Sequence, residues 1–426
     1  MATVDERAEV LKHSRISGPG WRTFLAVMGP GLVVMLADTD VGSIITAAQS
    51  GVQWGYRLLL LQLLLMPVLY IVQELTVRLG IFTGKGHGEL IRNTFGSGWA
   101  WVSVSGLGVA TTGALISEFS GVAGVGELFG IPRAASLGLV TVILLAIVLT
   151  GSYRRVERVA IALGLFELAF FVVAWRAHPR GAELASGLVH MPVKDSAYLY
   201  LVAANIGAVI MPWMIFYQQS AVADKKLRAC HYRHAQWDTA FGSVITQAVM
   251  AAVLLAAAAT IGKMHAGAAE ASLNSIGDIS KMLVPTLGAS VGRVVFGFGT
   301  IGAAMVAAIV VSLASAWGFG EVTGYRHSLE HHPLEAPWFY GIYALAVVGG
   351  ALVVDLVPNL VALNIGVQVM NALMLPLVLG FLVLLAFKAL PAEHRPSGPY
   401  AWLVIAVSVL TAGLGVYGGI TGAHLF

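Results

Sequence analysis

The chain contains eleven apolar segments, most of them about as long as the roughly 20 residues that an α-helix needs to cross a lipid bilayer. Inside a bilayer every backbone N–H and C=O must find its partner within the protein, and a continuous helix achieves this within its own segment. We therefore expect an all-α polytopic membrane protein with about 11 transmembrane helices. The segments lie at about residues 23–50, 57–79, 97–127, 134–152, 158–176, 197–221, 238–262, 289–320, 337–356, 359–388 and 400–421.

The composition agrees with this expectation and excludes several other classes of protein. Apolar residues make up 58% of the 426 residues and charged residues only 11%, whereas a soluble domain has about 25% charged residues. The single cysteine, Cys230, has no partner within the chain for a disulfide. The net charge of +3 comes from scattered basic residues, so we expect no nucleic-acid partner.

The basic residues also predict how the chain lies across the membrane. About two thirds of the 25 Lys and Arg residues fall on the side of the N-terminus, and short cytoplasmic loops are the ones that collect Lys and Arg. We expect a cytoplasmic tail at residues 1–22, one transmembrane transporter domain at 23–421 and, because the number of helices is odd, a C-terminus outside. The expected location is the plasma (inner) membrane.

Two of the apolar segments contain stretches that interrupt a helix. The first stretch is 29–43 and the second is 205–213, and both contain proline and glycine. The two segments are five crossings apart and so run in opposite directions, and paired broken helices in two inverted halves are typical of a transporter binding site. We expect an inverted 5+5 repeat, with a first repeat at about 23–176, a second at about 197–388 and an extra helix at about 400–421.

The first interruption carries two carboxylates, Asp38 and Asp40, well inside an apolar segment. A carboxylate at mid-bilayer costs about 2.5–3.5 kcal/mol, and two neighbouring carboxylates repel each other unless a cation or a proton lies between them. We interpret Asp40 as a cation ligand, assisted by Ser43 or by a freed backbone carbonyl. Asp38 is either a second ligand or a neutral acid that hydrogen-bonds to a neighbouring helix.

The second interruption places Met211 directly before a proline, at the position that pairs with the Asp40 break. A methionine among apolar residues is usually a packing residue. A thioether next to a carboxylate, however, suits a transition-metal ion better than an alkali ion. Gly207 and Ala208 would offer carbonyl oxygens at the same place.

Four further polar side chains lie inside apolar segments. Gln368 and Asn371 are one helical turn apart and so share a face of the helix. They either hydrogen-bond between helices or take part in a cation site. In such a site they would coordinate the cation directly with their amide oxygens or hydrogen-bond to the residues that do. Glu118 is either a proton carrier or a structural acid, and for Glu167 we favour the structural role.

Signatures of enzymes and of ATP-driven pumps are missing from the sequence. It has no GxGxxG motif that opens a helix, no Walker loop and no HExxH motif, and no loop is long enough for a nucleotide-binding domain. We therefore expect a protein that is not an enzyme, has no catalytic residue and holds no cofactor. No obligate protein partner is evident, and the lipid bilayer is the expected surrounding.

Several short motifs, in order along the chain, resemble those of the NRAMP family of divalent-metal transporters. The first helix of that family resembles Gly29-Pro30-Gly31, Asp40-x-Gly42 and Gln49-x-Gly51-x-x-x-Gly55-Tyr56. Its second helix and following loop resemble Gln73-x-Leu75-x-x-Arg78-Leu79-Gly80-x-x-Thr83-Gly84-Lys85. Further matches are Ser117-Glu118-Phe119, Met211-Pro212 and Gln368. The resemblance spans about residues 24–388.

The resemblance implies an inverted five-plus-five fold of the LeuT type, with helices 1 and 6 unwound, and a divalent metal ion as substrate. Carried over position by position, the metal ligands would be Asp40, Ser43 in place of an asparagine, the Ala208 carbonyl and Met211. Asp38, which has no counterpart acid in the family, and Gln368 complete the candidate ligands. Residues that contact the ligands or line the ion pathway would be Gly42, Gly207, Glu118, Trp213, Gln218 and Asn371.

The departures from the family concern proton carriers. The family has histidines where this chain has Trp213 and Gln218, and an acid where it has Leu115. Histidine titrates near neutral pH, whereas tryptophan and leucine cannot carry a proton. This pattern resembles the divergent NRAMP-related branch of magnesium and manganese carriers, and we expect alternating-access transport of Mn²⁺ and/or Mg²⁺ that is not coupled to protons.

The choice of ion and three other functions stay open at this point. Met211 favours Mn²⁺, whereas the extra Asp38 and the short Ser43 favour a roomier, oxygen-rich site for partly hydrated Mg²⁺. One alternative is a proton-coupled Mn²⁺/Fe²⁺ symporter. Another is a sodium-coupled organic-solute carrier of the same fold, although the two aspartates would repel an anionic substrate. A receptor or scaffold without transport would lack a soluble signalling domain.

Overall fold

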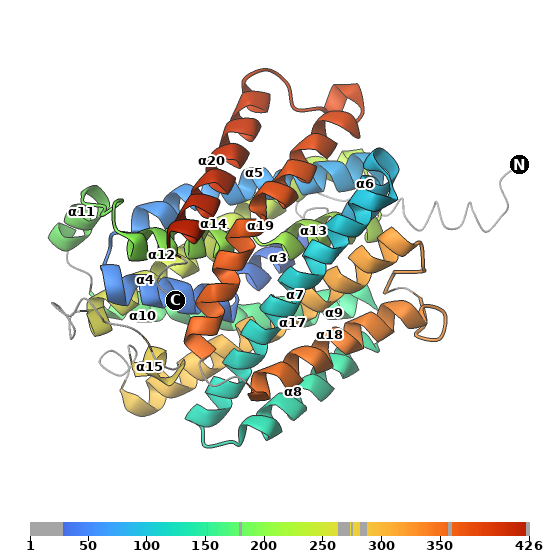
Figure 1. Cartoon of the computed structure of the whole chain (residues 1–426). Helices are drawn as coiled ribbons and strands as arrows, with labels where there is room; N and C mark the ends of the chain where they lie inside the picture. The colour runs from blue at the N-terminus through green and yellow to red at the C-terminus, as the bar shows by residue number, and fades with distance from the viewer. Residues whose placement is uncertain are drawn as a thin grey trace, which may run out of the picture.

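The computed structural model describes residues 29–150, 152–178, 181–262, 273, 276–281, 288–329, 331–356 and 360–422, and these residues form helices and no strands. Figure 1 shows long helices packed side by side in one bundle. The elements that correspond to the apolar segments are α3 (Pro30–Asp38), α4 (Val41–Trp54), α5 (Leu59–Thr83), α7 (Ser97–Leu128), α8 (Arg133–Val148), α9 (Tyr153–Gly164), the 3₁₀ turn η1 (Leu165–Leu168), α10 (Ala169–Arg176), α12 (Ser196–Val209), α13 (Pro212–Asp224), α14 (Tyr232–Ala257), α17 (Ala289–Thr323), α18 (Pro337–Leu356), α19 (Leu360–Lys388) and α20 (Gly398–Gly422).

Each of the eleven apolar segments contains a helix in the structure. Within the described residues, nine helices are long and apolar enough to cross a membrane, and the bent pair of α3 and α4 makes a tenth. The eleventh, α8, is apolar but shorter, with 16 residues. The predicted all-α polytopic fold is therefore confirmed. The predicted tail at 1–22 lies outside the described residues, and the boundaries of the two repeats stay predictions.

Three short helices in the connections were not expected from the sequence: α6 (His87–Phe95), α11 (Gly181–Val189) and α15 (Ile276–Lys281). They are too short to give a clear periodic pattern, and tertiary contacts stabilise helices of this length more than intrinsic propensity does. In α6 the first turn carries Glu89 and the last turn carries Arg92. That order of charges is the one that the helix dipole favours.

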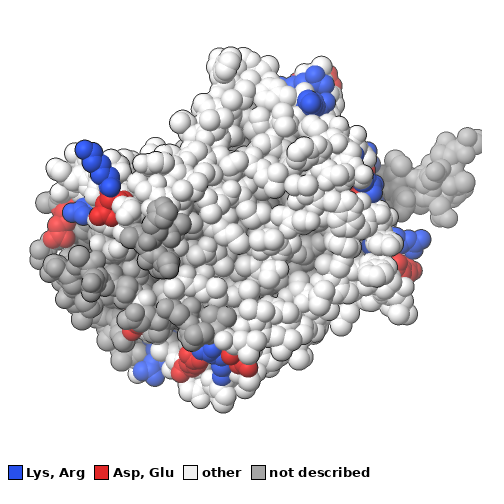
Figure 2. Space-filling model, in the orientation of Figure 1, with Lys and Arg blue, Asp and Glu red and all other residues white. Residues whose placement is uncertain are grey.

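Charged side chains lie at the ends of the bundle. In Figure 2 the coloured Lys, Arg, Asp and Glu residues follow the left and lower edges and the right edge, and the broad face between them is white. Large apolar side chains are exposed on the outer helices, among them Leu139, Leu345 and Trp402. An apolar belt between two charged ends is the surface that a bilayer-spanning bundle presents to lipid.

The half-helix α3 is held by α14. Asp238 on α14 accepts hydrogen bonds from three backbone N–H groups at the start of α3, those of Gly29, Gly31 and Leu32, at 2.8 to 3.2 Å. Near the other end of α3, Thr246 on α14 donates to a backbone carbonyl at 2.8 Å. The first N–H groups of a helix have no partner within it. Asp238 therefore supplies, from another helix, the cap that the sequence of α3 lacks.

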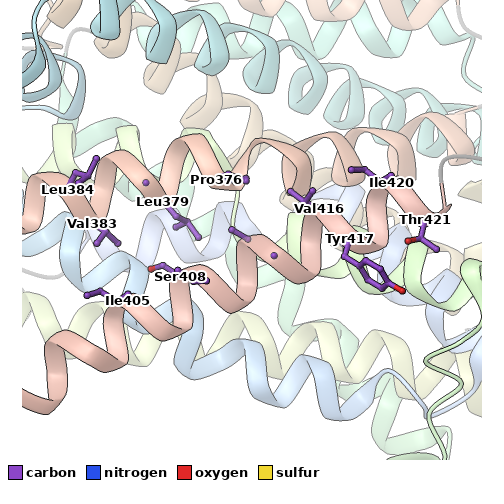
Figure 3. Close-up of a pocket in the computed structure, with 14 residues that line it drawn as sticks. Pro376, Leu379, Val383, Leu384, Ile405, Ser408, Val416, Tyr417, Ile420 and Thr421 are labelled. Atoms are coloured by element: carbon purple, nitrogen blue, oxygen red, sulfur yellow. The ribbon is translucent and has the colours of Figure 1, made fainter.

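A groove of about 840 Å³ runs between α19 and α20. Figure 3 shows aliphatic side chains from both helices along it, with Ser408 and Tyr417 among the few polar ones. The other side of α20 packs on α12, where Gly422 lies against Tyr200. None of the residues that line the groove belongs to the interrupted segments, so the candidate site lies elsewhere.

Candidate metal-binding site

The first break separates α3 from α4 at Thr39 and Asp40, and the axes of the two half-helices differ by 48°. Asp40 is the N-cap of α4, and its Oδ1 accepts a hydrogen bond from the Ser43 N–H at 2.6 Å. Aspartate is a favoured N-cap because its carboxylate satisfies an N–H that the helix leaves free. The local sequence therefore ends one helix and starts the next in the interior of the protein.

The second break lies between Val209, where α12 ends, and Pro212, where α13 begins. Between them, Met211 is extended, with φ −93° and ψ 140°, as a residue before proline prefers to be. Proline is well tolerated at the first position of a helix because that position needs no N–H. The break also frees the last carbonyl groups of α12 from the helical hydrogen-bond pattern.

One hydrogen bond joins the two breaks: the Ser43 hydroxyl donates to the Ala208 carbonyl oxygen at 2.9 Å. Asp40, Ser43 and Ala208 therefore form a continuous hydrogen-bonded chain from the start of α4 to the end of α12. Met211 lies three residues beyond Ala208 and is completely buried, as is Asp40. The structure thus places these four candidate ligands at the two facing breaks.

Helix α19 packs against both breaks at Gln368. A side chain at Gly42 would collide with the Gln368 amide, and a side chain at Gly207 would collide with the Gln368 backbone carbonyl. Glycine at these two positions lets α4 and α12 approach α19 closely. The Gln368 Oε1 accepts a hydrogen bond from Asn371 Nδ2 at 3.0 Å, whereas Gln368 Nε2 has no hydrogen-bond partner among the described residues.

Four buried acids surround the first break: Asp38, Asp40, Glu118 and Glu167. Glu118 on α7 accepts a hydrogen bond from the Val41 N–H at 3.3 Å, and its carboxyl group faces that of Asp40. The second oxygen of Asp40 and both oxygens of Asp38 have no hydrogen-bond partner among the described residues.

Within the described part of the chain, acidic, cysteine and histidine side chains do not form a metal site by themselves. Among the described residues, no group of three or more of them converges on a point where a metal ion could bind. A metal ion at the breaks would therefore combine a carboxylate with carbonyl, hydroxyl, amide and thioether groups, which matches the mixed set of candidate ligands.

The two candidate pathway residues on α13 lie in different settings. Trp213 is completely buried at the start of α13, and its indole N–H has no hydrogen-bond partner among the described residues. Gln218 accepts a hydrogen bond from Thr76 at 3.0 Å and donates one to Thr239 at 2.9 Å. Since it is seven residues after Met211, it lies about 10 Å farther along the helix. Gln218 thus joins α5, α13 and α14 away from the breaks.

Sequence reasoning missed two buried polar residues near these helices. Asn364 hydrogen-bonds with Ser117 and donates to Ser120 at 2.7 Å, which fastens α19 to α7; its spacing of four residues from Gln368 was the available signal. His87 on α6 hydrogen-bonds through Nδ1 to the Gln219 side chain on α13 at 2.8 Å. Burial lowers the pKa of His87 to about 4. No pattern in the sequence marks it.

Solved structures share this architecture. A manganese transporter of Eremococcus coleocola, in complex with an aromatic bis-isothiourea substituted compound, matches with a TM-score of 0.77 at 19% identity, over 96% of this chain and 90% of that chain. A Na⁺-coupled sialic acid symporter in a substrate-bound outward-open state matches with a TM-score of 0.62 at 13% identity, over 96% and 90%. MhsT in complex with L-phenylalanine matches with 0.62 at 14%, over 92% and 98%. These similarities confirm the predicted LeuT-type fold.

The family comparison covers nearly the whole chain. The model described as "Natural resistance-associated macrophage protein-like" matches residues 31–421. The matched range contains α4, α12, α13 and α19, and with them every residue placed at the two breaks. The chain therefore belongs to the natural resistance-associated macrophage protein-like (NRAMP) family.

Proposed function

We propose that this chain carries divalent metal cations, Mn²⁺ and/or Mg²⁺, across a membrane by alternating access and without coupling to protons. The observation that carries the proposal is the Ser43–Ala208 hydrogen bond, because it brings the Asp40 carboxylate and the freed carbonyls of α12 to one place. Membership of the NRAMP family and the fold shared with a manganese transporter support a metal ion as the substrate.

In this proposal the ion binds between the two breaks. Asp40 provides the negative charge, and the Ala208 carbonyl and the Ser43 hydroxyl provide neutral oxygen atoms. Met211 provides a thioether, which suits Mn²⁺ better than Mg²⁺. A half-turn of the Gln368 amide, which hardly changes its shape, would direct its oxygen toward Gly42 and the ion. Mg²⁺ would keep several of its waters in such a site.

The breaks also supply the hinges that alternating access needs. Closure around a ligand usually occurs through a few residues at the ends of helices that absorb large changes in backbone angle. Thr39 and Asp40 link two half-helices that already differ in direction by 48°. An ion that contacts both α4 and α12 would favour the conformation in which the two breaks face each other, because only that conformation offers all ligands at once.

The absence of proton coupling is supported by the residues along α13. Trp213 occupies a position where the family has a histidine, and its indole does not titrate. His87 hydrogen-bonds to Gln219 on α13, and burial lowers the pKa of His87 to about 4. His87 is therefore neutral near pH 7 and does not exchange protons there.

Ion uptake into proteoliposomes tests this proposal. Vesicles that contain the protein should accumulate Mn²⁺ or Mg²⁺ down a gradient while the internal pH stays constant, and Asp40→Ala should abolish uptake. Glu89→Gln, at a partly exposed position on α6, should transport like the wild type. Internal acidification driven by the metal would refute uncoupled transport. No uptake of any divalent ion would refute the proposal as a whole.

We further propose that the chain lies in the plasma (inner) membrane with its N-terminus in the cytoplasm and its C-terminus outside. The distribution of basic residues supports this orientation. Cys230 is exposed in the connection between α13 and α14, which would then be cytoplasmic. A membrane-impermeant maleimide should label Cys230 in inside-out vesicles and leave it unlabelled in intact cells, and the reverse result would invert the topology.

A further inference from the structure

Two buried acids beside the first break take no part in the proposed substrate site. Both carboxylate oxygens of Asp38 and both of Glu167 have no hydrogen-bond partner among the described residues, and the two residues are 1% and 0% exposed. A carboxylate at mid-bilayer costs about 2.5–3.5 kcal/mol even on insertion scales. Groups of this kind persist in membrane proteins where a bound ion or another function compensates for the cost.

Glu167 is directed into the protein by a short 3₁₀ turn. η1 interrupts the helical span Arg155–Arg176, and a stretch of 3₁₀ helix within an α-helix often marks a functional hinge or a strained sequence. Glu167 is the buried residue of η1, whereas Leu165, Phe166 and Leu168 are exposed. The turn therefore presents three apolar side chains to the surrounding lipid and one acid to the interior.

Close packing brings η1 next to the end of α3. A Cβ atom on Gly164, just before η1, would lie 2.7 Å from Cδ1 of Leu36, which is two residues before Asp38. A Cβ atom on Gly302 of α17 would lie 2.6 Å from the carbonyl oxygen of Leu163, the residue before Gly164. The residues just before η1 thus pack against both α3 and α17, and Glu167, the buried residue of the turn, lies close enough to the end of α3 to interact with Thr39 and Asp38.

The number of carboxylates exceeds what one divalent ion neutralises. Asp38, Asp40, Glu118 and Glu167 carry up to four negative charges, and none of the ion pairs within the described ranges involves them. A divalent ion at Asp40 compensates for two charges. The C-terminal end of α3, where Asp38 lies, adds the negative end of a helix dipole, which favours a cation.

We propose that Asp38 and Glu167 form a second cation site, separate from the substrate site at Asp40, that binds a hard cation through oxygen atoms alone. The two carboxylates provide charge, and the Thr39 hydroxyl and the carbonyl groups at the end of α3 complete the ligands. Sulfur is absent from this set, so Na⁺ and Mg²⁺ or Mn²⁺ all fit its chemistry. A cation there joins α3 to η1 and so fixes the half-helix that precedes Asp40.

The test counts bound ions on the purified full-length protein. Equilibrium dialysis with Mn²⁺ is performed in Na⁺ and in choline, and the melting temperature is measured in the same two media. Asp38→Asn and Glu167→Gln keep the shape of the side chain and remove its charge. Asp40→Asn addresses the substrate site, and Glu89→Gln on α6 is the control for a lost carboxylate elsewhere.

If the second ion is divalent, the wild type binds two Mn²⁺ ions per chain, and Asp38→Asn, Glu167→Gln and Asp40→Asn each bind one. If it is Na⁺, the wild type binds one Mn²⁺ ion, and Na⁺ raises the melting temperature of the wild type and Asp40→Asn but not that of Glu167→Gln.

The second site would be overturned if the wild type bound one Mn²⁺ ion and Na⁺ did not raise its melting temperature. It would also be overturned if Na⁺ still raised the melting temperature of Glu167→Gln. Loss of all Mn²⁺ binding in a folded Glu167→Gln protein would also overturn it, because the two sites would then be one. If no Mn²⁺ binds to the wild type but Na⁺ stabilises it through Glu167, the proposed Mn²⁺ transport fails, the uptake assay decides on Mg²⁺, and the second site stands.

Discussion

The two helix breaks meet in the same place but are built by opposite means. At the first, Asp38, Thr39 and Asp40 end one half-helix and cap the next, and the axis turns by 48°. At the second, α13 begins at Pro212 without a side-chain cap, and α12 and α13 together form one span, Ser196–Asp224. The first break therefore contributes charge, and the second contributes carbonyl oxygen and sulfur without charge.

If a metal ion binds between the breaks as proposed, this difference separates affinity from selectivity. Charge in the bilayer is expensive, and of the two breaks only the first carries carboxylates. The opposite break is neutral, and its ligand types can change without any change in net charge. On this view Asp40 decides whether a cation binds, and Met211 decides which one. The following substitutions test that division, from the largest expected effect on transport to the smallest.

Asp40→Asn should reduce the initial rates of both Mn²⁺ and Mg²⁺ uptake at least about 100-fold, because removing a buried charge from its partner costs about 3 kcal/mol or more. Asp195→Asn is a matched control, since Asp195 is also an N-cap aspartate but lies at the exposed start of α12. It should transport like the wild type. Equal losses in both variants would assign the effect to helix capping instead of charge.

Gly207→Ala should reduce uptake about tenfold and lower the stability by about 1–3 kcal/mol, because the added methyl group collides with the Gln368 backbone and overpacks the contact between α12 and α19. Gly366→Ala on α19 is the control, since a Cβ atom there meets nothing within 4 Å. Uptake rates and melting temperatures measure both effects. Normal transport by Gly207→Ala would show that this close approach is not needed.

Met211→Leu should weaken Mn²⁺ binding about tenfold and leave Mg²⁺ binding unchanged, because leucine keeps the volume of methionine and removes only the sulfur. Met214→Leu, at a completely buried methionine within α13, should affect neither ion. Competition between Mn²⁺ and Mg²⁺ during uptake gives the ratio directly. An equal loss for the two ions would assign Met211 to packing.

His87→Gln should leave uptake at pH 7 unchanged and alter only the acid sensitivity of the fold. Burial lowers the pKa of His87 from 6.5 to about 4, so between these values the unfolded chain binds a proton that the folded chain does not. Stability is therefore lost as the pH falls from about 6.5 to about 4, by up to about 3 kcal/mol. Melting temperatures across this range should fall less in His87→Gln than in the wild type. If the melting temperatures of the wild type and of His87→Gln fell equally with pH, the lowered pKa of His87 would be contradicted.

The positions of the breaks could be predicted because their causes are local. Pro212 and the N-cap residue Asp40 both favour the start of a helix, and the apolar segments around them can be recognised in the sequence. The pairing of the two breaks could be predicted because the two segments are five membrane crossings apart. The cap at Asp238 could not be predicted, because it joins residues that are 209 positions apart. Neither could the direction of Glu167, because the 3₁₀ turn changes the helical phase on which any assignment of faces depends.

The cap on α3 also has a consequence for the order of synthesis. A ribosome that adds about 5–20 residues per second reaches Asp238 about 10–40 s after Gly29, because the two residues are 209 positions apart. Until then the start of α3 lacks its acceptor, although α4 has carried its own cap, Asp40, from the beginning. The half-helix at the start of the bundle is therefore among the parts that reach their final place late in biogenesis, once the seventh apolar segment has entered the membrane.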